Sequence, residues 1–262
     1  MNAPDSARIA GLPEAGGYLR GESQVPEELT GCWRRNWIRF ADGTVDDTTQ
    51  VFWLQHGVAM VDIRIPASQP VAAGRTSFAQ FDLDELAKLA DSESSSGHTA
   101  CTPVDLDPAG VRRATAEWFT RDQVHDPSDG IRSVAFQPVT AYPEPGLLAW
   151  SGDGSVMVER APSGDYIEEW SLVPGSRETF EDEVRDGGVR WFRTGNVAAL
   201  VRDRRVPVPR PARLQQLVAE CDGDRASMEA LLDCEFSVAV LNPNGGWEIV
   251  ASTLPWRKGV VL

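Results

Sequence analysis

The chain has few of the residues that build metal centres and disulfide frameworks. Its 262 residues include three histidines and four cysteines. His56, His98 and His125 stand far apart without the spacing of metal ligands, so we expect them to be structural or exposed, with no metal and no cofactor. No C-x-x-C pair occurs, so we expect reduced, structural thiols at Cys32, Cys101, Cys221 and Cys234.

Positive charge and long hydrophobic runs are also scarce. The formal net charge is −14 and the pI is about 4.7, which disfavours nucleic acid and anionic membranes because both need a basic surface. No apolar run approaches the roughly 20 residues that span a bilayer. The first residues lack the basic start and apolar segment of a secretory signal, so we expect a cytoplasmic globular protein.

Motifs that would assign a reaction are missing as well. The sequence has no P-loop, no G-x-G-x-x-G after a strand and no G-x-S-x-G elbow. Asp105-x-Asp107 and Asp126-Pro-Ser-Asp129-Gly lack the terminal Glu of a calcium loop, so we expect them to form turns.

Strand-like segments joined by tight turns dominate the first third of the chain. Residues 33–40 lead to a turn at Asp42-Gly43, and residues 48–55 lead to a turn at His56-Gly57, where hairpins are expected. Apolar spacing predicts short helices near 82–90, 211–223 and 224–234, the first with a capping box of Asp82 and Glu85. The serine-rich run 92–97 is expected to be a loop.

Two stretches half a chain apart resemble each other. VFWLQHGV from Val51 is similar to VRWFRTGNV from Val189, which makes Trp53 and Trp191 equivalent. Each stretch continues into an apolar strand that ends in basic residues and Pro, and an amphipathic helix follows. An internal repeat of this kind predicts two related β-rich halves.

Many short strands at close spacing favour antiparallel barrels over a parallel sheet. We therefore expect an all-β fold with a few short helices, made of two antiparallel β-barrels. Residues 1–28 would form a mostly irregular arm, 29–150 the N-terminal barrel and 151–262 the C-terminal barrel. In an alternative division, strands near 156–170 complete the first barrel.

The hairpin of residues 48–66 has no plainly polar face. One face carries only apolar side chains and must pack against a core: Phe52, Leu54, Ala59, Val61, Ile63 and Ile65. The other face mixes large apolar and polar groups, as ligand cavities do. There Trp53 and Met60 would supply apolar contact, Arg64 and Gln55 would anchor a polar or anionic group, and Asp62 would orient Arg64. The alternative is that this second face is simply the outside of the protein.

A second hairpin carries paired carboxyls. A turn at Ser163-Gly164 places Glu159 opposite Glu168, with Tyr166 and Trp170 on the same face. Paired carboxylates in a partly dry site acquire separated pKa values, which can supply an acid and a base near neutral pH. The alternative is a solvated pair on an acidic protein.

Several motifs together resemble the Hrr-interacting (HRI) protein family, from about residue 29 to the C-terminus. They are Trp33-Arg34-Arg35, Val51-Phe52-Trp53-Leu54-Gln55, Asp62-Ile63-Arg64-Ile65-Pro66, Glu159, Tyr166-x-Glu168-x-Trp170 and Ser252-Thr253-Leu254-Pro255-Trp256-Arg257. The resemblance implies a pair of lipocalin-like (calycin-like) antiparallel barrels. It implies no particular reaction and no catalytic residues.

Three functions follow from these patterns. The preferred one is binding of a small, partly apolar molecule in the N-terminal barrel by Trp53, Gln55, Met60, Asp62, Arg64 and Trp170. The second is a cofactor-independent isomerase, cyclase or lyase acting on a small substrate, in which Glu159 and Glu168 share acid and base duties and Tyr166 donates a proton. The third is a module that binds protein partners through its outer surface and holds no ligand.

Overall fold

The computed structural model describes residues 25–120, 134–138 and 143–262. Most of the expected N-terminal arm, residues 1–24, lies outside these ranges. His125 and the segment Asp126–Asp129 lie outside them too.

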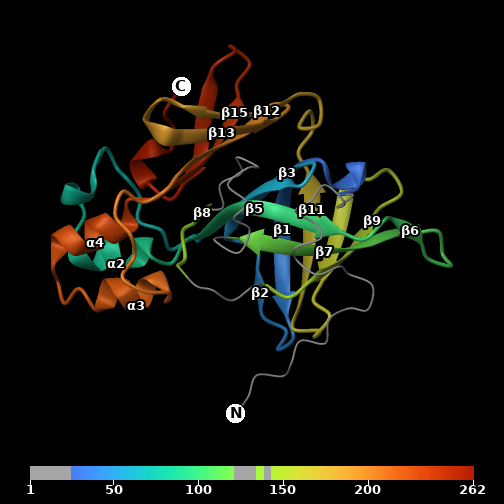
Figure 1. Cartoon of the computed structure of the whole chain (residues 1–262), viewed down its shortest axis with the longest axis horizontal. Helices are drawn as coiled ribbons and strands as arrows, with labels where there is room; N and C mark the ends of the chain where they lie inside the picture. Colours follow the sequence, from blue (N-terminus) through green and yellow to red (C-terminus); the bar gives the residue numbers. More distant parts are fainter. Residues whose placement is uncertain (1–24, 121–133, 139–142) are drawn as a thin grey trace.

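An antiparallel β-barrel forms the larger part of the molecule (Figure 1). Its eight main strands are β1 (Gly31–Phe40), β3 (Gln50–His56), β4 (Ala59–Ile65), β5 (Glu93–Cys101), β7 (Arg112–Thr120), β9 (Gly146–Trp150), β10 (Val156–Arg160) and β11 (Tyr166–Leu172). Each of these strands pairs with the next, and β11 pairs with β1 to close the ring. Three short strands pair at its margin: β2 (Val45–Asp46) with β1, β6 (Asp105–Leu106) with β7 and β8 (Val134–Ala135) with β5.

The barrel therefore ends at Leu172, beyond the boundary expected at residue 150. Residues 151–155, which follow the expected boundary, form the tight turn between β9 and β10. The Asp153 carboxylate accepts hydrogen bonds from Ser151 Oγ and from the backbone N–H and Oγ of Ser155. Strands β10 and β11 complete the ring, as the alternative division has it.

A second antiparallel sheet stands where a second barrel was expected. Its strands follow one another in chain order: β12 (Phe180–Arg185), β13 (Val189–Thr194), β14 (Val197–Arg202), β15 (Glu235–Leu241) and β16 (Trp247–Ser252). β12 and β16 are the two ends of this order, so the sheet stays open. It has no need to close on itself, because the outside of the barrel covers its inner face. The expectation of a mostly β fold is confirmed.

The apolar face of the β3–β4 hairpin lies between the barrel and this sheet. Leu54, Val61 and Ile63 are fully buried in one core together with Phe192 and Phe236 of the second sheet. Strand β3 packs against β13, and β4 packs against β15 and β16. This contact explains why the hairpin has no wet face: one side meets the second sheet and the other faces the barrel interior.

Three short helices close one side of the shared core (Figure 1). They are α2 (Leu83–Leu89), α3 (Leu214–Ala219) and α4 (Arg225–Leu232). The expected capping box of α2 is present, since Asp82 accepts from the Glu85 N–H while Glu85 accepts from the Asp82 N–H. Single 3₁₀ turns are η2 (Glu27–Leu29), η3 (Phe78–Gln80), η5 (Asp186–Gly188) and η6 (Pro255–Arg257). None of the helices in the described part of the chain has the length and apolar character needed to cross a bilayer.

Two local predictions are wrong. The run at 92–97 belongs largely to barrel strand β5 rather than to a loop, because Ser94 and Ser96 are buried between β4 and neighbouring strands. The β3–β4 turn lies at Gly57–Val58, one residue later than expected, so Trp53 pairs with Asp62 and Gln55 with Met60. A turn one residue later shifts the residue opposite each β3 position by two places along β4. Because two is an even number, every side chain keeps its predicted face.

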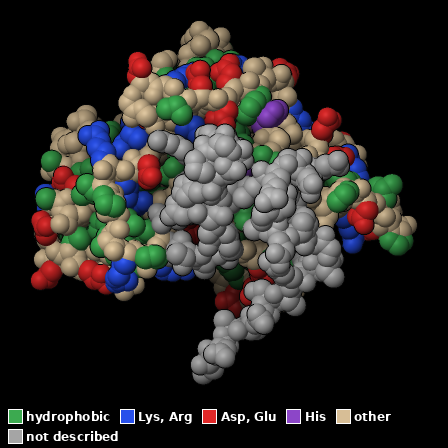
Figure 2. Space-filling model, viewed as in Figure 1, with side chains coloured by type: hydrophobic (Ala, Val, Ile, Leu, Met, Phe, Trp, Pro, Cys, Tyr) green, Lys and Arg blue, Asp and Glu red, His purple; other side chains and the backbone are tan. Residues whose placement is uncertain are grey.

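The barrel is filled at one end. Leu29 and Trp33 are fully buried there, with Trp33 Nε1 donating to the Leu29 carbonyl at 2.8 Å. Trp150 and Met157 pack in the same cluster. The outer surface carries both signs of charge, and Lys and Arg side chains gather over the helical region in the face shown in Figure 2.

Candidate functional site

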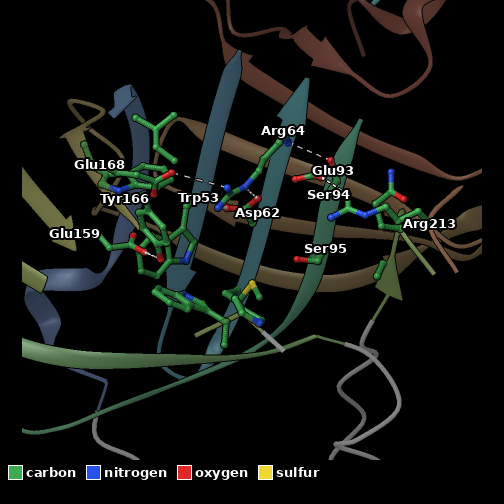
Figure 3. A pocket seen from close by; sticks show the side chains of 17 residues that line it. Trp53, Asp62, Arg64, Glu93, Ser94, Ser95, Glu159, Tyr166, Glu168 and Arg213 are labelled. Atoms are coloured by element: carbon green, nitrogen blue, oxygen red, sulfur yellow. Dashed lines mark hydrogen bonds and ion pairs between the residues drawn. The ribbon is translucent and has the colours of Figure 1, made fainter. Parts of the chain in front are cut away.

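The other end of the barrel holds a cavity of about 470 Å³ (Figure 3). Eight of the sequence-predicted site residues line it: Trp53, Met60, Asp62, Arg64, Glu159, Tyr166, Glu168 and Trp170. Strand alternation brings them together, because Met60, Asp62 and Arg64 follow one another at every second position of β4, and Tyr166, Glu168 and Trp170 do the same on β11.

A chain of ion pairs runs along the wall. Arg64 Nε lies 2.8 Å from Asp62 Oδ1, and Arg64 Nη2 lies 3.2 Å from Asp62 Oδ2. Arg64 Nη1 is also 3.9 Å from Glu168 Oε1. That same Glu168 oxygen accepts from Arg35 Nη1 at 2.9 Å, and Arg35 Nη2 reaches Asp46 at 3.0 Å. Asp62 therefore orients Arg64, and a second arginine compensates the buried Glu168.

Glu159 lies directly opposite Glu168, as predicted from the hairpin turn. Both carboxyls are buried, with 4% and 2% of the residue exposed, which excludes the solvated-pair alternative. Tyr166 Oη donates to Glu159 Oε1 at 3.0 Å. Burial, and next the negative charge of Glu168, raise the pKa of Glu159 to about 8. Burial beside these carboxyls also raises the pKa of Tyr166, so the phenol stays protonated.

Tryptophans form the apolar wall. The Trp53 ring centroid lies 5.5 Å from that of Trp118 and 5.9 Å from that of Trp170, both in edge-to-face contact. Trp53 Nε1 donates to Gln55 Oε1 at 3.0 Å. Trp170 Nε1 is buried and has no acceptor among the described residues.

Gln55 is the one predicted ligand contact that does not line the cavity. It is fully buried beneath the cavity, where its amide bonds the Gly57 and Ala59 carbonyls, Trp53 Nε1 and Thr99 Oγ1. Its polar atoms are therefore engaged in fixing the end of the hairpin, and they are not available to anchor a ligand group.

Other lining residues were not singled out from the sequence. Trp118 comes from β7, Ser95 from the run expected to be a loop, and Glu93 and Arg213 lie at the rim with about half or more of their side chains exposed. Arg35 stands behind the wall. The alternation of Trp33 and Arg35 on one strand was an available signal, but Glu168, the partner of Arg35 on β11, is 133 residues away in the sequence.

Residues with metal-binding side chains do not gather here. No cluster of three or more potential ligands occurs within residues 25–120, 134–138 and 143–262. The His56 ring stacks on Phe180 with centroids 3.7 Å apart, and His98 is buried in β5. All four cysteines are free thiols, three of them buried.

Comparisons with known proteins add little to this geometry. No protein-family model matches the chain, and no match was found among curated proteins. One similar solved structure is the crystal structure of an uncharacterized protein, YLR301w, from Saccharomyces cerevisiae. It is 12% identical, the alignment covers 85% of this chain and 84% of that chain, and the TM-score is 0.44. A likeness at this level supports no statement about function, and the resemblance to the Hrr-interacting protein family stays a prediction.

Proposed function

We propose that the protein binds a small, partly apolar molecule inside its barrel, in the manner of a lipocalin-like binding protein. The cavity walled by Trp53, Trp118 and Trp170 is the observation that carries this proposal. Its volume of about 470 Å³ lies in the range of small-molecule sites, which are mainly apolar with a few placed polar groups.

The polar groups of the cavity support a bound molecule better than a packed interior. Glu159 and Trp170 Nε1 both have hydrogen-bonding capacity that the described residues leave unused. Arg64 keeps a third of its side chain exposed while Asp62 holds its guanidinium in place. A protein that acts only through its outer surface has no use for such a cavity, so a filled barrel would be expected of it.

Native mass spectrometry of freshly purified protein tests this proposal. The wild type should retain a small molecule, and Ser95→Phe should reduce its occupancy at least tenfold, since Ser95 faces the cavity from β5 and a phenyl ring would take up space that the molecule needs. Leu147→Phe is the matched control, because it enlarges an exposed side chain on another barrel strand. A wild type that carries nothing, or a Ser95→Phe variant that retains the molecule equally, would contradict the proposal.

The second candidate is a cofactor-independent enzyme. It is supported by the different environments of two carboxyls that face each other. Glu159 has a pKa raised to about 8, whereas Glu168 forms an ion pair with Arg35. A group that titrates near neutral pH suits general acid catalysis. The molecule released from Glu159→Gln, compared with that from the wild type by chromatography and mass, separates the two functions. An enzyme would leave on the variant a compound that differs from the one on the wild type, whereas a binding protein would carry the same compound on both, at equal or lower occupancy on the variant.

A further inference from the structure

The charges around the cavity are unbalanced in favour of carboxyls. Its ionisable lining comprises Asp62, Glu93, Glu159 and Glu168 against Arg64 and Arg213. Asp62 already pairs with Arg64, and Glu168 and Asp46 share Arg35. Arg213, at the rim, lies 3.6 Å from Glu93. An anionic molecule would therefore find each of these arginines already matched by a carboxylate.

Glu159 is the lining carboxyl that has no described cation within ion-pair distance, and the charge of Arg64 acts on it only from farther away. It forms no ion pair with any described Lys, Arg or His, and its one hydrogen bond comes from the Tyr166 hydroxyl. It nevertheless lines the cavity and is almost fully buried. A buried carboxyl of this kind gains most from an opposite charge brought close to it.

Aromatic rings surround the same place. Trp118 and Trp170 each meet Trp53 edge to face, with ring centroids 5.5 and 5.9 Å apart, so the three rings pack against one another as one aromatic wall. Gly146 lies beside both Glu159 and Trp118, since a Cβ there would lie 3.0 Å from Glu159 Oε1 and would clash with the edge of the Trp118 ring. The face of an aromatic ring attracts a cation, and aromatic side chains are a common part of sites that bind substituted ammonium groups.

We propose that the molecule in the cavity carries a substituted ammonium group, which lies against the aromatic wall of Trp53, Trp118 and Trp170 and faces the Glu159 carboxyl. The inference rests on the proposed binding function and specifies its ligand class. A neutral apolar molecule would use the rings but not the carboxyl. An anion would add negative charge to a wall that already has an excess of it.

The pH dependence of binding follows from the groups that face Glu159. They are Tyr166 and Glu168 on β11 and Asp62 and Arg64 on β4. Because the Glu159 pKa is about 8 in the free protein, the carboxyl is mostly protonated at pH 6 and must lose its proton to pair with a cation. Affinity for a permanently charged ammonium should therefore rise with pH, by up to about tenfold per pH unit, and level off above pH 8.

Three probes of similar size test the inference. Benzyltrimethylammonium and neopentylbenzene have the same shape and differ in charge, and phenylacetate is an anion with the same ring. Tryptophan fluorescence and calorimetry should show the ammonium binding wild-type protein at least tenfold tighter than its carbon isostere at pH 8.5. Glu159→Gln should remove this preference and its pH dependence while neopentylbenzene binding remains. The control is Glu169→Gln, which changes the carboxyl next to Glu168 on the outer face of β11. It should keep the preference for the ammonium and the pH dependence of that preference.

The outcomes separate the inference from the function on which it rests. Equal binding of the ammonium and its isostere, preference for phenylacetate, or no binding of any probe would overturn the inference. The binding function falls with it only if native mass spectrometry also finds no retained molecule.

Discussion

Arg35 lies between Glu168 and Asp46 behind the cavity wall, and its guanidinium bonds both carboxylates. The sequence could place Glu168 on the same face as Tyr166 and Trp170, because every second residue of a strand shares a face. It could also place Glu168 opposite Glu159, because the Ser163-Gly164 turn sets the register of the hairpin. It could not supply the partner of Glu168. Arg35 sits next to a register shift between Arg35 and Trp37 in β1, and such irregularities have no clear signature in a single sequence.

Arg35→Met should destabilise the protein by about 3–5 kcal/mol at neutral pH, because Glu168 would keep its buried charge and lose its closest cation. Urea unfolding at pH 7 measures this loss. Arg39→Met, at an exposed position of the same strand, should change stability by less than about 0.5 kcal/mol, and an equal loss in both variants would contradict this role of Arg35.

Elements were predictable where a local signal matches the local structure. The capping box and apolar spacing of α2 gave its position, and the glycine-containing turns gave the hairpins. Strand β5 was missed because its first half is serine-rich and carries no apolar alternation. Its neighbours β4 and β7 impose the strand on it, and its small Ser95 side chain leaves space in the barrel where the cavity lies.

Removal of the helix cap by Asp82→Ala should cost about 1 kcal/mol of stability, since the Glu85 N–H would lose its side-chain acceptor, while the backbone N–H of residue 82 could still donate to the Glu85 side chain. The expected consequence for the cavity is small, because α2 packs in the core outside the barrel. Asp84→Ala, in the same first turn but without a capping bond, serves as the control in thermal unfolding. A variant at Asp82 as stable as the control would show that the box contributes nothing.

At the scale of the whole molecule, the sequence predicted two similar halves, and the structure shows a closed barrel beside an open sheet. The difference is decided by packing between segments far apart in the chain, which no local pattern reports. Both halves contribute buried side chains to one shared core of β3, β4, the second sheet and the helices. The two parts are therefore expected to unfold together.

Phe236→Ala tests this coupling, because Phe236 belongs to the second sheet and is fully buried in the shared core. The variant should lose about 3–5 kcal/mol of stability. Hydrogen exchange measured by mass spectrometry should show lower protection in barrel strands β3 to β5 as well as in β13 to β16. Val184→Ala, at an exposed position of β12, is the control. Unchanged protection of the barrel would mean that the halves unfold separately.

Leu29 and Trp33 fill the end of the barrel opposite the cavity, so the barrel is closed at that end. A bound molecule cannot leave past this filled end, and among the described lining residues Glu93 and Arg213 are well exposed to solvent. Substitutions at these two side chains are therefore expected to change the rate at which the occupant leaves as well as the rate at which it enters.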